Sequence, residues 1–193
     1  MNAAPPLDPG SEFLVRLGRV EATLRDHAGS GPAPGLTPPD PPTGERWDWG
    51  QVWAHLGEFV PYWLEQIRLI LNRPAEADPV AFGRVKSDLV RVAAIAADRG
   101  RPPPELFERL ERHVAELREQ LGAMPPQDWR RRGLHSALGV MDMPRIVEEF
   151  LVGHLEAHAG QLDELAAGVR PGEARPRGGG SAERPPRPSG PRS

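Results

Sequence analysis

Apolar side chains recur every three or four residues through residues 47–71, and this periodicity limits the fold more than any other feature of the sequence. On an α-helix such spacing collects the side chains on one face, which must be buried against other elements. Core packing is therefore the simplest role for the tryptophans of this segment. The apolar face is broad and consists of Trp49, Val52, Trp53, Leu56, Phe59, Val60, Trp63, Ile67 and Ile70.

Four further segments show helical spacing, and no segment shows the alternation of a half-buried strand. We predict helices over residues 11–29, 78–100, 103–124 and about 144–168. Helices of such length, joined mostly by short connections, are typical of antiparallel bundles. The sequence thus predicts an all-α fold, an antiparallel four-helix bundle with an additional helix. In the segment 78–100 the residues predicted to face the core are Phe82, Val85, Leu89, Val92 and Ile95.

Proline and glycine collect in two stretches that cannot continue a helix. Residues 29–46 contain ten prolines and glycines in eighteen positions, so we expect a linker there. The stretch 170–193 is rich in Arg, Pro and Gly, and such a composition cannot bury enough apolar surface to fold. We therefore expect one bundle domain over residues 10–169, a disordered tail at 170–193 and a disordered N-terminus at 1–9.

The charge distribution excludes some classes of function. The net charge is −3, but six arginines lie in the tail, so the remaining chain is more acidic than this value suggests. An acidic domain lacks the basic face that phosphate contacts need, and we expect no nucleic-acid partner. No apolar run approaches the roughly 20 residues that span a bilayer, and the first residues show no signal peptide. We therefore expect a cytoplasmic protein without a membrane partner.

Two histidines, His154 and His158, lie four residues apart within the last predicted helix. This spacing places both imidazoles on one helix face, about 5–6 Å apart at their Cβ atoms. The pair alone is weak support for a metal site, because core histidines occur at this spacing by chance. A zinc protease motif is excluded, since that motif needs Glu directly after the first His and Leu155 stands there.

His55, in the helix predicted over residues 47–71, is a candidate third ligand. It lies beside the apolar face of that helix and can point into the bundle, where facing helices can build a metal site. Three imidazoles buried without partners would be costly, and a shared cation would remove that cost. Three histidines with one open coordination position are typical of catalytic rather than structural metal sites.

Three stretches of the chain resemble the DinB superfamily over roughly residues 10–168. They are WDWGQVWAHLGEFVPYW, WRRRGLH and FLVGHLEAHAGQL. This superfamily includes the mycothiol-dependent maleylpyruvate isomerase N-terminal domains and the bacillithiol and mycothiol S-transferases. The resemblance implies that His55, His154 and His158 are the ligands of a divalent metal, with zinc or nickel expected. It also implies a low-molecular-weight thiol as co-substrate.

Two functions follow from this resemblance as alternatives. One is a metal-dependent thiol S-transferase or thiol-dependent isomerase, which would act on a small thiol and an electrophilic substrate. Because the chain has no cysteine, the reacting sulfur would have to come from such a thiol. The other is a metal-binding bundle without turnover, with a binding or stress-response role. The chain could also form a homodimer through an exposed helix face.

Other polar residues near these motifs have open roles. Glu58 could orient the imidazole of His55, although a surface carboxylate is the simpler interpretation. Gln161 could reach the open metal position. The run of Arg130 to Arg132 could meet an anionic substrate, or it could be solvated.

The remaining histidines have simpler expected roles. We expect His135 to be a hydrogen-bonded loop anchor, and Trp129 near it to be part of the core. We expect His113, flanked by charges, to face solvent. His27 lies at the end of the first predicted helix, where a cation is favourable.

Overall fold

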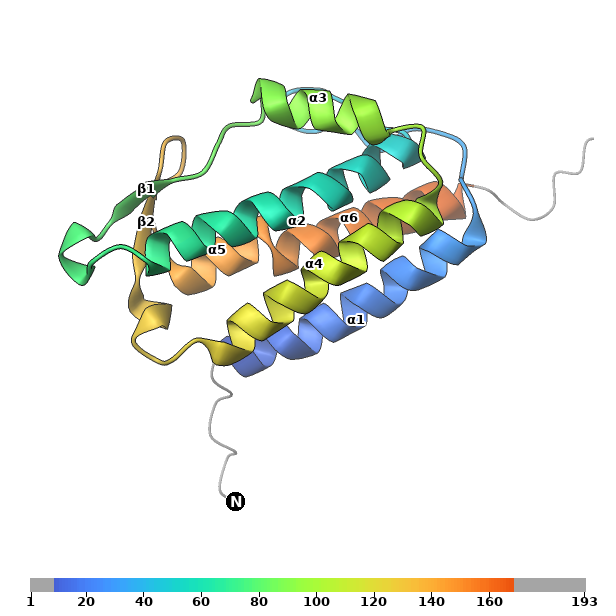
Figure 1. Cartoon of the computed structure of the whole chain (residues 1–193). Coiled ribbons are helices and arrows are strands. Elements are labelled where there is room, and N and C mark those ends of the chain that lie inside the picture. Colours follow the sequence, from blue (N-terminus) through green and yellow to red (C-terminus); the bar gives the residue numbers. More distant parts are fainter. Residues whose placement is uncertain (1–8, 169–193) are drawn as a thin grey trace, which may run out of the picture.

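The computed structural model describes residues 9–168, and four helical rods pack side by side in it (Figure 1). Two helices close together in sequence, α5 and α6, make up the fourth rod. A further helix, α3, lies on the outside of α2. The helices are α1 (Pro9–Ser30), α2 (Trp49–Leu71), α3 (Leu89–Asp98), α4 (Pro103–Ala123), α5 (Met143–Phe150) and α6 (Val152–Ala167), with short 3-10 turns η1 (Ala75–Ala77) and η2 (Asp128–Arg130).

The apolar faces of the four rods form one continuous core. Helix α1 packs against α4 and α6, and α2 packs against α3, α4 and α6. Each fully buried large side chain stabilises the fold by about 1.5–3 kcal/mol relative to an exposed one. The largest include Leu17 and Leu24 of α1, Trp53 and Phe59 of α2, and Leu110 and Leu117 of α4. The predicted four-helix bundle with an additional helix is therefore confirmed.

Helix α2 forms the centre of the bundle and has a well-defined start. Its N-cap Asp48 accepts a hydrogen bond from the Gln51 main-chain N–H at 2.8 Å, and the Gln51 side chain accepts one from the Asp48 N–H at 3.1 Å. This reciprocal pair satisfies two donors that the first turn would otherwise leave free. The helix then continues through Pro61 to Leu71.

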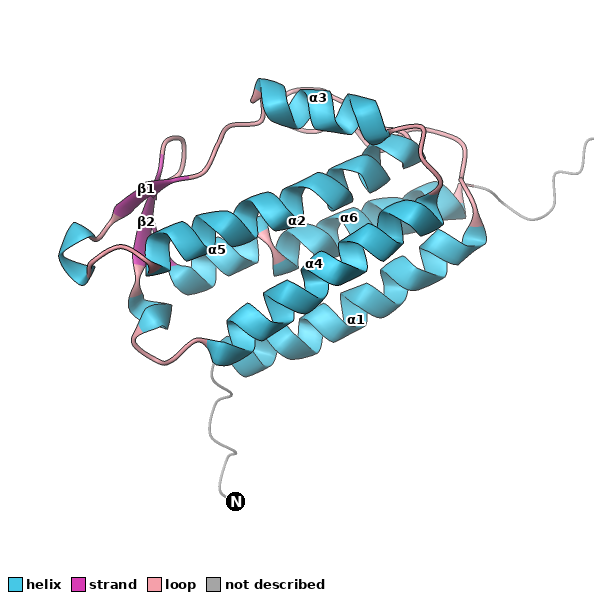
Figure 2. Ribbon diagram, in the orientation of Figure 1, coloured by secondary structure: helices cyan, strands magenta, loops and turns pink. Residues whose placement is uncertain are grey.

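The prediction that the chain contains no strand is wrong. Strands β1 (Val80–Phe82), β2 (Arg132–His135) and β3 (Gly139–Asp142) form a small sheet at one end of the bundle (Figure 2). Strand β1 pairs parallel with β2, and β2 pairs antiparallel with β3. The strands are only three or four residues long, too short for their alternation to stand out in the sequence.

The helix predicted over residues 78–100 is correspondingly shorter. Val80 and Phe82 are buried with exposed Ala81 between them, which is strand rather than helix periodicity. Gly83 follows with φ of 86°, a conformation that ends any helix. Helix α3 begins only at Leu89. Of the residues predicted to face the core, Phe82 and Ile95 are buried, whereas Val85, Leu89 and Val92 are exposed.

The single helix predicted over residues 144–168 is divided in two. The break lies at Leu151, whose φ and ψ of −130° and −87° are not helical. Gly153 permits this break, because a Cβ at that position would lie 2.5 Å from the Glu148 carbonyl oxygen. The break sets the start of α6, and thus the direction in which the histidines of α6 point.

The proline-rich segment between α1 and α2 packs onto the bundle. Residues 31–48 contain no helix or strand, but Thr37 and Trp47 are buried. The Thr37 main-chain N–H donates to the Trp47 carbonyl at 2.8 Å, and the Trp47 N–H donates to Thr37 Oγ1 at 3.0 Å. The segment expected as a linker therefore forms a loop that packs on the bundle. Some of its main-chain and side-chain groups form hydrogen bonds with one another.

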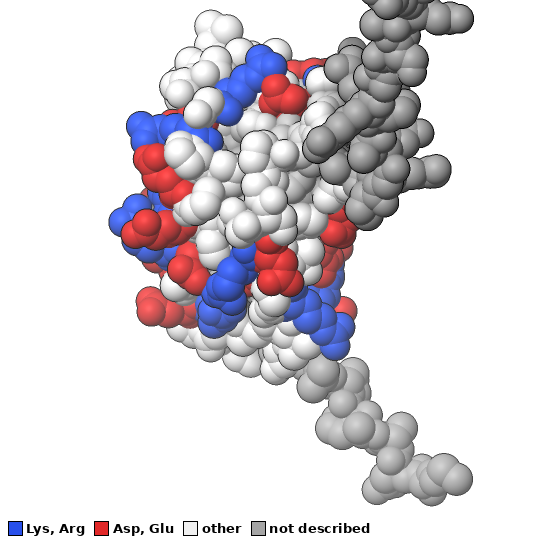
Figure 3. Space-filling view, turned by 90° about the vertical axis from the view of Figure 1, so that its right-hand side faces the viewer, with Lys and Arg blue, Asp and Glu red and all other residues white. Residues whose placement is uncertain are grey.

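Charged side chains of both signs lie on the surface of the bundle. On the face shown in Figure 3, blue and red side chains are interspersed. Ion pairs also join the rods: Arg16 contacts Glu148 and Glu156, each at 2.6 Å. Among residues 9–168, no helix is both long enough and apolar enough to cross a membrane. The disorder predicted for 1–9 and 170–193 concerns residues outside those described, apart from Pro9, with which α1 begins.

Candidate metal centre

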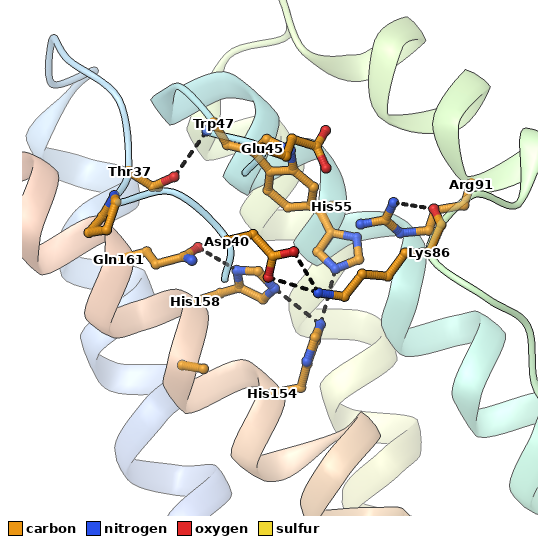
Figure 4. A pocket seen from close by; sticks show the side chains of 12 residues that line it. Thr37, Asp40, Glu45, Trp47, His55, Lys86, Arg91, His154, His158 and Gln161 are labelled. Atoms are coloured by element: carbon orange, nitrogen blue, oxygen red, sulfur yellow. Dashed lines mark hydrogen bonds and ion pairs between the residues drawn. The ribbon is translucent and has the colours of Figure 1, made fainter. Parts of the chain in front are cut away.

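The structure brings His55, His154 and His158 together between α2 and α6 (Figure 4). The His154 Nε2 atom lies 3.1 Å from the Nε2 atoms of both His55 and His158. One nitrogen atom from each of the three rings lies within 4.8 Å of the others. The convergence that the sequence predicted for these three residues is therefore present in the fold.

Burial keeps these imidazoles neutral. His55 and His158 are only 4% and 6% exposed. Burial, together with the neighbouring histidines, lowers the pKa of His55 well below its usual value, and burial likewise lowers that of His154. The pKa of His158 falls to about 4, again mainly because of burial. Neutral imidazoles have a free lone pair, which is the form that binds metals.

Hydrogen bonds to the outer ring nitrogens decide which lone pairs face the centre. His55 Nδ1–H donates to Glu58 Oε1 at 2.7 Å, and His158 Nδ1–H donates to Gln161 Oε1 at 2.8 Å. The Nε2 atoms of both rings then carry lone pairs, and a single proton on His154 Nε2 could satisfy only one of them. Three basic nitrogens at one point match the donor set of a divalent cation such as zinc or nickel.

Glu58 accepts the hydrogen bond from the outer nitrogen of His55. This agrees with the interpretation that Glu58 orients the His55 imidazole, and not with that of a surface carboxylate. Its side chain is 8% exposed, and its second oxygen accepts a hydrogen bond from Arg84. Burial raises the pKa of Glu58, an effect that Arg84 opposes. Arg84 in turn lies over the Tyr62 ring, 3.9 Å from its centroid. This chain of contacts holds the His55 ring in place, as outer carboxylates do in metal sites.

Gln161 does not act as the sequence suggested. The sequence left open that it could reach the open coordination position, but it bonds to the outer nitrogen of His158. It also lines the cavity beside the histidines. Its role is thus to orient His158, as Glu58 orients His55.

The histidines form the floor of a cavity of about 180 Å³. The segment between α1 and α2 covers one side of it, and Lys86 and Arg91 approach from the other (Figure 4). Trp47 stacks on His158 with ring centroids 5.8 Å apart and lies edge-on to His55 at 5.0 Å. The cavity is large enough for a small organic molecule that contacts the three nitrogens.

Most of the cavity lining was not predicted from the sequence, including four large side chains: Asp40, Trp47, Lys86 and Arg91. Asp40 and Trp47 lie in or beside the segment expected to be a linker. Lys86 and Arg91 lie within the stretch predicted as one long helix. No local signal marks these four residues, because their proximity depends on how the loops fold back over α2.

The other histidines lie outside the site. His135 Nε2–H donates to the Arg84 carbonyl at 3.1 Å, and its Nδ1 accepts from Ala137 and Leu138, so it is the expected anchor, although in a strand. His27 pairs with Asp163 at 2.8 Å. The expectation that His113 faces solvent is wrong, since it is half-buried, 3.7 Å from Glu116.

The aromatic and basic residues leading into β2 have structural contacts. Trp129 is buried as expected and stacks on Phe13 with centroids 5.9 Å apart. Arg131 donates to the main-chain carbonyls of Ile70 and Arg73, and Arg132 pairs with Asp78 at 3.0 Å. Neither arginine lines the cavity.

Comparison with known proteins agrees with this fold. Residues 17–149 match the family model of the mycothiol maleylpyruvate isomerase N-terminal domain, a range that contains His55 but ends before His154. No curated protein matches the chain. YfiT from Bacillus subtilis, described as a probable metal-dependent hydrolase with an unusual four-helix bundle topology, matches at 16% identity and a TM-score of 0.64. The match covers 86% of this chain and 92% of YfiT. The chain shares the four-helix bundle fold of YfiT and belongs to the mycothiol maleylpyruvate isomerase N-terminal domain family.

Proposed function

We propose that this protein is a metal-dependent enzyme that uses a low-molecular-weight thiol, either to join the whole thiol through its sulfur atom to an electrophile or to assist an isomerisation. The observation that carries the proposal is the meeting of three neutral imidazole nitrogens at the floor of a cavity. When bound, a divalent cation with an open position lowers the pKa of a thiol or water placed there. Zinc and nickel are the metals we propose.

The residues of the chain have separate tasks in this scheme. His55, His154 and His158 would hold the cation, and Glu58 and Gln161 fix the orientation of two of the rings. Trp47 stacks on His158 and covers one face of its ring. A site shielded in this way strengthens electrostatic interactions within it.

The thiol and the electrophile would both be small molecules. The chain has no cysteine, so its own sulfur cannot react. The family description names mycothiol, which supports a thiol of that type. Such thiols are kept reduced in the cytoplasm, where we propose that the protein acts.

Metal analysis tests the first half of the proposal. We expect about one divalent metal ion per chain after incubation with zinc or nickel, and we expect replacement of His154 by Ala to abolish binding, because two remaining ligands hold a cation poorly. The matched control is His113→Ala, which removes a half-buried histidine outside the site. Wild-type protein that stays metal-free in zinc, nickel and manganese would overturn the proposal.

Turnover assays test the second half. The loaded enzyme is given mycothiol or bacillithiol with a panel of electrophiles, and conjugates and isomerised products are measured against the His154→Ala variant. Hydrolysis without added thiol would instead support water as the nucleophile, as the description of YfiT suggests for that protein. Metal binding without any turnover would support the alternative of a non-catalytic metal-binding bundle.

A further inference from the structure

Arg91 is an unusual residue to find beside a candidate metal site. It lies in the first turn of α3, and its side chain is only 11% exposed. Its guanidinium lies 5.3 Å from the centroid of the Trp47 ring, which covers the histidines. Figure 4 shows Arg91 next to His55, at the side of the cavity.

The charge of Arg91 is poorly compensated. Its Nη1 donates to the Lys86 main-chain carbonyl at 2.8 Å, a neutral acceptor. Within residues 9–168, the carboxylate found within 4.0 Å of it is that of Glu58, at 4.0 Å from Nε. Glu58 is already engaged by His55 and Arg84. Burial lowers the pKa of Arg91, an effect that the carboxylates of Glu58, Glu45 and Asp40 oppose without a close ion pair to the guanidinium.

The other cation of the cavity is already paired. Lys86 Nζ lies 2.8 Å and 3.0 Å from the two carboxylate oxygens of Asp40. This ion pair lies at the edge of the cavity, and its lysine is 59% exposed. Of the two cations that line the cavity, Arg91 is thus the one whose charge is available to a ligand.

A positive charge at this place also opposes the binding of a cation. The charge of Arg91 adds to the effect of burial in lowering the pKa of all three histidines, so its field reaches each ring. It would repel a metal ion held by them. An anionic group that enters the cavity would be attracted both by this arginine and by the metal.

We propose that Arg91 binds a carboxylate group of the substrate in this cavity, next to the converging histidine nitrogens. The planar guanidinium matches a carboxylate in shape and charge, and its fork can donate two parallel hydrogen bonds. The inference rests on the proposed function and names its substrate class: a small organic molecule that carries a carboxylate. Arg91 is then the residue that selects such molecules over uncharged ones.

The test compares two thiol probes on cobalt-loaded protein: 3-mercaptopropionate and its uncharged amide. Thiolate binding to cobalt gives a near-ultraviolet absorption band from which each dissociation constant is measured. We expect wild-type protein to bind the carboxylate at least about tenfold more tightly than the amide, or about 1.4 kcal/mol. Arg91→Gln should lose this preference, and Arg91→Lys should keep part of it.

The matched control is Arg99→Gln, at the C-cap position of the same helix, α3. Arg99 is 54% exposed, pairs with Asp48 and does not line the cavity of the histidines. This variant should keep the wild-type preference. Equal binding of the two probes by wild-type protein, or an unchanged preference in Arg91→Gln, would overturn the inference.

Two further measurements separate this inference from the proposed function. Arg91→Gln should bind cobalt as tightly as wild-type protein or more tightly, because it removes a repelling charge. Loss of cobalt binding in this folded variant would mean that Arg91 supports the site structurally and would overturn the inference. When a chelator keeps the protein free of metal, propionate should raise the melting temperature of wild-type protein but not of Arg91→Gln. This last result decides the inference even if no metal binds.

Discussion

At the scale of single residues, the site depends on side chains that orient the histidines from outside. Glu58 and Gln161 each accept the Nδ1 proton of a histidine that lies three residues away on the same helix. A helix places residues three apart on neighbouring positions of one face, so each pair forms locally. Arg84 then joins Glu58 from a loop far along the chain. The orientation of His55 therefore depends on both local and tertiary contacts.

Replacing Glu58 by Gln should weaken metal binding. The amide can still accept the His55 proton, but it removes the negative charge that raises the basicity of the ring and that pairs with Arg84. We expect a loss of about 10-fold or more in metal affinity, measured by competition with a coloured chelator. Glu65→Gln, at a 65%-exposed position of the same helix, is the control and should bind like wild type. Equal affinities for all three proteins would show that Glu58 has no such role.

At the scale of elements, the fourth rod consists of two helices, and the break between them sets the start of α6 at Val152. Leu151 leaves the helical conformation, and Gly153 lets the chain pass the Glu148 carbonyl. His154 and His158 follow directly, one turn apart on α6. The loop before α2 and the loop between β1 and α3 then supply the walls of the cavity.

Two glycines of α6 should respond in opposite ways to replacement by Ala. A Cβ at Gly153 would lie 2.5 Å from the Glu148 oxygen, so Gly153→Ala should destabilise the protein by about 1–3 kcal/mol. Gly160 has open space at its Cβ position, so Gly160→Ala should stabilise the helix by up to about 1 kcal/mol. Urea unfolding measures both free energies. The idea that the break between α5 and α6 requires Gly153 fails if the two variants behave alike.

At the scale of the whole molecule, the bundle brings three neutral histidines together, with His55 and His158 buried and His154 half-buried. Each of them has a lowered pKa in the folded state, about 4 in the case of His158. The unfolded chain binds protons at these residues below about pH 6.5, where the folded chain does not. Their contribution to stability is therefore complete above about pH 6.5 and is lost as the pH falls toward the folded pKa.

The metal-free protein should thus become less stable in weak acid. In chelator, we expect the free energy of unfolding to fall between about pH 6.5 and 5 by up to about 1.4 kcal/mol per pH unit for each histidine that stays neutral. The raised pKa of Glu58 acts in the opposite sense and offsets part of this loss. His158→Gln removes one of the groups and should show a shallower pH dependence of urea unfolding than wild type. A slope that does not change in this variant would contradict the assignment.

The sequence by itself determined that the chain forms a helical bundle and that three of its histidines are candidates to meet inside it. Helical periodicity in segments of about twenty residues is a strong signal, and His55, His154 and His158 stand on or beside the apolar faces that such periodicity defines. The short strands, the break at Leu151 and the start of α3 were not predictable, because three or four residues carry too little pattern.

Only the tertiary structure decided what surrounds the histidines. Asp40, Trp47 and Lys86 come from loops and Arg91 from the first turn of α3, and no pattern in the sequence places these four residues together. Their positions follow from long-range contacts, such as the pairing of Thr37 with Trp47 and of Asp40 with Lys86. Helix faces are set by local spacing, whereas the walls of a cavity are set by which loops meet. For that reason the candidate ligands were readable from the sequence and the residue proposed to select the substrate was not.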